Sequence, residues 1–141
     1  MIRRSLAVAS LAVLFAGPVY AASMKYDAAL TPSAEVPPTK STGSGEASVT
    51  LDTATHEITW NVTFKGFSSA VTAAHIHGPA AAGKNAGVVV PLGNAPTSPI
   101  HGSKKLTSEQ EQQLEAGMYY INVHTKSNPS GAIRGQLMKA E

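Results

Sequence analysis

Three histidines are the residues of this sequence best suited to metal chemistry. His75 and His77 are separated by a single residue, and His124 lies in a later apolar segment. Because side chains two residues apart on a β-strand point to the same face, a strand at 71–77 would present the first two imidazoles side by side. A third imidazole from a neighbouring strand would complete a metal site with an open position. Neutral imidazole suits copper, zinc, iron and nickel, so the pattern predicts a transition metal rather than calcium.

Two further residues could extend this site. His101 lies in a segment rich in Pro and Gly, which we expect to be a loop that could carry it to the metal as a fourth ligand. Arg134 follows His124 by ten residues, and a hairpin between them would return it close to the level of His124. A guanidinium beside an open metal position would attract and hold small anions. A structural role, in a hydrogen bond to a loop carbonyl or an ion pair, is an equal alternative for Arg134. His56 is expected at an exposed turn, outside the site.

The residue types argue against several other functions. The chain has no cysteine, which rules out thiolate ligands, cysteine nucleophiles and disulfides. The acidic residues of 107–115 are expected on a solvated helix, which disfavours a hydrolase with paired carboxylates. The sequence contains neither a nucleophile elbow nor a Gly-rich phosphate loop after a strand.

The first 21 residues have the pattern of a secretory signal peptide. Two arginines form a cationic start, residues 5–16 include an apolar run, and the small residues ending at Ala21 suit cleavage after that position. The run is too short to span a bilayer, although a retained membrane anchor is the alternative. We therefore expect a secreted, periplasmic protein whose mature part, residues 22–141, is one domain with no membrane span.

The charge of the mature chain gives no reason to expect nucleic acid as a partner. The whole sequence has 11 Lys and Arg against 9 Asp and Glu, and two arginines would leave with the signal peptide, so the mature chain is neutral. No basic cluster with interleaved aromatic residues remains.

The mature sequence consists mostly of short strand-like segments separated by Gly, Pro and Ser. The clearest is 57–64, in which apolar and polar residues alternate. Further strands are predicted at 22–30, 45–51, 71–77, 87–92, 118–125 and 132–138. A capping-box sequence predicts one helix at 107–115, and 93–103 is predicted to be a loop. These elements predict an all-β fold, an antiparallel β-sandwich or Greek-key-like barrel with one short connecting helix.

The predicted strand 118–125 divides into two faces. Its apolar set, expected in the core, is Tyr119, Ile121 and Val123. His124 then lies on the opposite face or at its rim. Whether this face meets the one that carries His75 and His77 does not follow from spacing.

Four sequence blocks resemble the CHRD domain, a family named after chordin. They are His-Ile-His-Gly-Pro-Ala (75–80), Leu-Thr-x-x-Gln (106–110), Gly-x-Tyr-Tyr-x-Asn-Val-His-Thr (117–125) and Asn-Pro-Ser-Gly-Ala-Ile-Arg-Gly-Gln-Leu (128–137). The resemblance covers the chain from about Tyr26 to Leu137, and the last two blocks are specific. It implies a β-sandwich, as in bacterial secreted proteins and in the repeats of animal chordin, and leaves the biochemical activity open.

The histidine pattern also resembles the copper side of the Cu/Zn superoxide dismutases. In that resemblance His75 and His77 match the HxH pair, and His124 matches a later strand histidine. Arg134 would stand for the anion-guiding arginine, and His101 would supply a remaining ligand. This chain lacks the disulfide and the dense His/Asp loop that would hold zinc. The resemblance therefore implies a copper-only site, with one copper per chain and no zinc.

Three hypotheses follow from these patterns. The leading one is a secreted copper protein with superoxide dismutase activity, in which Arg134 steers the superoxide anion. The second is a periplasmic copper carrier or buffer that uses the same three histidines, with a methionine as a soft ligand for Cu(I). The candidate methionines are Met24, Met118 and Met138. The third is a metal-free protein-interaction module in which the histidines are structural.

Overall fold

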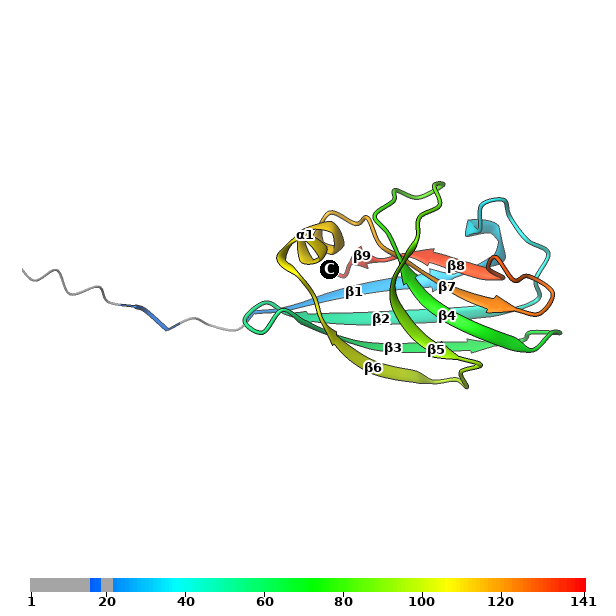
Figure 1. Ribbon diagram of the computed structural model, residues 1–141, viewed down its shortest axis with the longest axis horizontal. Coiled ribbons are helices and arrows are strands. Elements are labelled where there is room, and N and C mark those ends of the chain that lie inside the picture. Colours follow the sequence, from blue (N-terminus) through cyan, green and yellow to red (C-terminus); the bar gives the residue numbers. More distant parts are fainter. Residues whose placement is uncertain (1–15, 19–21) are drawn as a thin grey trace, which may run out of the picture.

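The computed structural model of the chain, shown in Figure 1, describes residues 16–18 and 22–141. Apart from 16–18, the predicted signal peptide lies outside the described residues. Two antiparallel sheets pack face to face, with one short helix at an end of the molecule. The all-β sandwich expected from the sequence is thus confirmed. Within the described part of the chain, no helix is both long and apolar enough to cross a bilayer.

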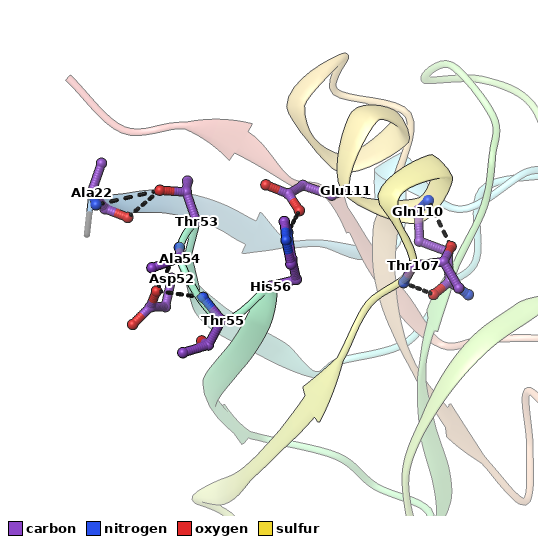
Figure 2. Close-up of polar contacts among 9 residues, drawn as sticks. All are labelled: Ala22, Asp52, Thr53, Ala54, Thr55, His56, Thr107, Gln110 and Glu111. Atoms are coloured by element: carbon purple, nitrogen blue, oxygen red, sulfur yellow. Dashed lines mark hydrogen bonds and ion pairs between the residues drawn. The ribbon is translucent and has the colours of Figure 1, made fainter. Parts of the chain in front are cut away.

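The larger sheet has five strands in the order β6-β3-β2-β1-β9. They are β1 (Ser23–Leu30), β2 (Ser44–Asp52), β3 (Glu57–Lys65), β6 (Ile100–Lys105) and β9 (Met138–Lys139). The hairpin of β2 and β3 pairs along its whole length, from Ser44 opposite Lys65 to Asp52 opposite Glu57. The Asp52 carboxylate closes its turn by accepting hydrogen bonds from two backbone N–H groups, those of residues 54 and 55 (Figure 2).

The smaller sheet has four strands in the order β5-β4-β7-β8. They are β4 (Val71–His77), β5 (Val88–Asn94), β7 (Tyr120–Thr125) and β8 (Ile133–Gln136). The strands β4 and β7 lie side by side at the centre of this sheet, although more than 40 residues separate them in the chain. The two histidine segments therefore share one sheet.

The core lies between the two inner faces. Its fully buried aliphatic residues include Leu30, Val49, Leu51, Ile58 and Val62 from the larger sheet, and Ile121, Val123 and Ile133 from the smaller one. The burial of Ile121 and Val123 confirms the predicted inner face of β7. His124 consequently lies on the outer face of the smaller sheet.

The helix α1 (Ser108–Glu115) begins with the predicted capping box. The Thr107 side chain accepts from the Gln110 backbone N–H at 3.2 Å, and the Gln110 side chain accepts from the Thr107 N–H at 3.0 Å (Figure 2). His56, at the β2–β3 turn, contacts the Glu111 carboxylate of this helix. His56 therefore ties the helix to the hairpin.

The prediction of a loop at 93–103 is confirmed for 95–99 and wrong at both ends, because β5 continues to Asn94 and β6 begins at Ile100. Glycine suggested a loop, but Gly102 lies opposite Trp60 on β3. A Cβ at position 102 would come within 2.3 Å of the indole ring. This glycine therefore leaves room for an aromatic side chain from the neighbouring strand, which is a recognised use of glycine within a sheet.

We expect Gly102→Ala to lower the free energy of unfolding by about 1–3 kcal/mol, because the added methyl group overlaps the Trp60 ring. Urea denaturation followed by tryptophan fluorescence would measure this loss. Ser103→Ala is the matched control, since Ser103 is exposed on the same strand. Equal stability of the two variants would contradict the packing of the indole over Gly102.

Candidate metal centre

His75, His77 and His124 come together on the outer face of the smaller sheet. β4 carries the first two, and its register with β7 pairs His75 with Asn122 and Ala73 with His124. One nitrogen atom from each of the three rings lies within 4.8 Å of the other two. Metal–nitrogen bonds of about 2.0–2.1 Å would hold such nitrogens about 3–4 Å apart. Small side-chain rotations would therefore suffice for the three rings to bind one ion.

Hydrogen bonds to backbone carbonyls select the ligand atom of two of these rings. The Nδ1–H of His77 donates to the Ala86 carbonyl at 3.0 Å, and the Nδ1–H of His124 donates to the Pro129 carbonyl at 2.9 Å. A neutral imidazole has one N–H, so each Nε2 carries a lone pair and no proton. Such carbonyl-anchored rings are typical of histidines that bind metals.

The inward-facing nitrogens of the three rings have few partners. Nε2 of His77 is buried and has no hydrogen-bond partner among the described residues. Nε2 of His124 accepts a hydrogen bond from the Nδ1–H of His75 at 2.9 Å, a bond that an ion bound to both atoms would replace. His77 is 9% exposed and His124 is 8% exposed, so water has little access to them. Nδ1 of His75 and the Nε2 atoms of the other two rings are therefore the candidate ligand atoms.

Burial keeps these imidazoles in the form that binds metal. Desolvation lowers the pKa of His75 to about 4, and the neighbouring His124 and His77 rings contribute to this shift. Desolvation also lowers the pKa of His77. At neutral pH both rings are uncharged, as coordination requires.

Arg134 lies on the same face of the sheet but is separated from the histidines. Its guanidinium carbon is 3.4 Å from the centroid of the Tyr120 ring, and that ring stacks on His77 with centroids 5.0 Å apart and planes within 5°. Since β4 and β8 flank β7, Tyr120 lies between His77 and Arg134. The guanidinium is 2% exposed and donates hydrogen bonds to the Lys84 carbonyl and to Asn85 Oδ1. Of the two roles expected from the sequence, Arg134 therefore has the structural one, a hydrogen bond to a loop carbonyl. It does not lie directly beside the open position of the candidate metal site.

His101 is not part of the cluster, which corrects its expected place beside the other histidines. It lies on β6 in the other sheet, where it is exposed and paired with Asn61. Among the described residues, the group able to hold a metal contains only the three histidines named above. Met24 and Met138 lie on β1 and β9, also in the larger sheet.

Glu35 is the residue of this face that the sequence analysis missed. It follows the short 3-10 helix η1 (Pro32–Ala34), is 5% exposed, and accepts a hydrogen bond from Asn122 Nδ2 at 3.4 Å. Burial raises the pKa of Glu35 to about 7, although Arg134 and the Asn122 hydrogen bond both lower it. Its proline-rich surroundings indicated irregular structure, and no local pattern indicated that this carboxyl group is buried.

Comparisons with known proteins show the family and leave the chemistry open. No curated protein matches the chain. The family model of the CHRD domain matches residues 26–137, a range that contains all three clustered histidines and most of both sheets. Because this match covers most of the sequence, the chain belongs to the CHRD domain family.

Proposed function

We propose that this protein is a secreted, periplasmic copper protein with superoxide dismutase activity, in which His75, His77 and His124 hold the metal. The observation that carries the proposal is the convergence of three imidazoles around the buried Nε2 of His77, which has no partner among the described residues. A buried acceptor without a partner is costly, and such groups commonly mark the place of an ion or ligand. The residues therefore fit a metal ion.

The donor set supports copper as that ion. For a given nitrogen site, divalent copper binds more tightly than the other first-row metals, zinc included. Bound copper would supply one-electron chemistry, in which one superoxide ion is oxidised to O2 and a second, with two protons, is reduced to hydrogen peroxide. The three histidines would hold the ion in uncharged form, and three ligands leave a coordination position free for the anion.

A copper carrier is the second candidate, and the position of Arg134 favours it. The guanidinium is buried behind Tyr120, so this residue offers no exposed positive charge to guide an anion. A carrier needs the same three ligands but no such guidance. Turnover therefore has to decide between the two functions.

The test is superoxide decay after pulse radiolysis, with protein loaded with one equivalent of Cu(II) and then desalted. We expect the decay rate to rise in proportion to bound copper, because each site turns over independently. With His124→Ala, loaded and desalted in the same way, superoxide should decay at the same rate as with the metal-free protein. Retained copper without faster decay would support the carrier, and loss of copper on desalting would support the metal-free module.

A further inference from the structure

The segment 78–87 is held by side chains that adjoin the metal centre. It links β4 to β5, at the top of the view in Figure 1. The Ala86 backbone N–H donates to the Tyr120 hydroxyl at 3.0 Å, and the hydroxyl lies 3.2 Å from the Ala86 carbonyl. The same carbonyl accepts from His77 Nδ1 at 3.0 Å. The backbone of Ala86 is therefore bonded both by Tyr120 and by a candidate metal ligand.

Arg134 contacts both Tyr120 and the two residues that precede Ala86. Its Nη1–H donates to Asn85 Oδ1 at 2.9 Å, and its Nη2–H donates to the Lys84 carbonyl, so it holds the two residues that precede Ala86. Its guanidinium also packs on the Tyr120 ring. A planar, forked side chain can make these contacts together, whereas lysine cannot.

These contacts constrain His77 in two ways. The Ala86 carbonyl can only accept, so it keeps the His77 proton on Nδ1 and leaves Nε2 free. The stacked Tyr120 ring, parallel to the imidazole within 5°, fixes the plane in which Nε2 points. If the segment moved away, the proton could pass to Nε2, the atom that would bind the metal.

We propose that Arg134 is a positioning residue of the metal centre. Acting through Tyr120 and the segment 78–87, it holds His77 as the Nδ1–H tautomer with Nε2 directed into the cluster. Its effect on metal affinity rests on the proposed function, but its effect on the His77 tautomer does not require a metal.

The test combines three measurements on Arg134→Gln, with Lys104→Gln as the control. The control removes an equal charge from an exposed position on β6. Imidazole ¹⁵N NMR of the metal-free protein at neutral pH should show one His77 tautomer in the wild type and a mixture of both in Arg134→Gln. The affinity for Cu(II) should fall by about 10- to 100-fold, as is typical when the support of a metal ligand is lost. The nitrogen hyperfine pattern of the Cu(II) electron paramagnetic resonance spectrum should change with it. Lys104→Gln should match the wild type in all three.

Tyr120→Phe provides a second variant, which keeps the ring and loses both hydrogen bonds to Ala86. It should shift the tautomer balance in the same direction by a smaller amount, so the proposal can be tested even if Arg134→Gln does not fold. A wild-type tautomer and wild-type copper affinity in a folded variant would overturn the positioning role and leave the copper site intact. Altered tautomers in a protein that does not bind copper would support the positioning role and overturn the proposed function.

Discussion

Replacement of His77 or His124 by alanine is expected to lower the affinity for Cu(II) by more than about 100-fold. This exceeds the loss of affinity that is usual when only a hydrogen-bond partner of a metal ligand is removed. Each substitution removes one of only three clustered nitrogens, and the two that remain would bind the ion far less tightly. Chelator competition would measure the affinity. Electron paramagnetic resonance would show the loss of the nitrogen hyperfine splitting that several imidazoles produce.

The matched control for these variants is His101→Ala, since His101 lies exposed on the opposite sheet. It should bind Cu(II) as the wild type does. Similar losses in all three variants would mean that copper binds nonspecifically to surface imidazoles. Copper binding at wild-type affinity in both His77→Ala and His124→Ala would refute the assignment of these ligands.

Replacement of Glu35 by glutamine is expected to stabilise the metal-free protein by about 3 kcal/mol above pH 7, and by little at pH 4. Burial raises the pKa of Glu35 from 4.5 to about 7. Between pH 4.5 and about pH 7, Glu35 keeps its proton in the folded chain and releases it in the unfolded chain. The stability of the wild type therefore falls as pH rises through this window and levels off above it, whereas glutamine has no proton to release.

Urea denaturation of both proteins at a series of pH values from 4 to 8, with a chelator present, would measure this difference. Glu46→Gln is the control, because Glu46 is exposed on β2. Its difference from the wild type should be small at every pH. A Glu35→Gln curve parallel to that of the wild type would show that the Glu35 carboxyl group titrates normally in the folded protein.

Asn122 connects Glu35 to the candidate metal centre. Its Nδ2 contacts Glu35, and its backbone pairs with His75. Gly131, with a φ of 128°, lies against the same contact, and a Cβ at this position would come within 2.4 Å of Asn122 Nδ2. The contact between Asn122 and Glu35 therefore leaves no space for a larger residue at position 131.

The sequence by itself determined most of the local elements and indicated the histidines of the candidate metal centre. Alternation of apolar and polar residues identified β3 and the inner face of β7, and the capping box located α1. These signals are local, because each depends on the periodicity or the hydrogen bonds of one continuous segment. The His-x-His spacing likewise placed two imidazoles on one face of a strand before any partner strand was known.

Only the tertiary structure decided which residues meet. The pairing of β4 with β7 brings together His75 and His124, which are 49 residues apart, and leaves His101 in the other sheet. The same pairing order put Tyr120 between His77 and Arg134, and the loop after β1 buried Glu35. The pairing of β6 with β3 also placed Gly102 opposite Trp60, whose ring occupies the space that a Cβ would need. Strand order and burial depend on contacts between distant segments. The periodicity of residues within one segment does not show which other segment it will contact.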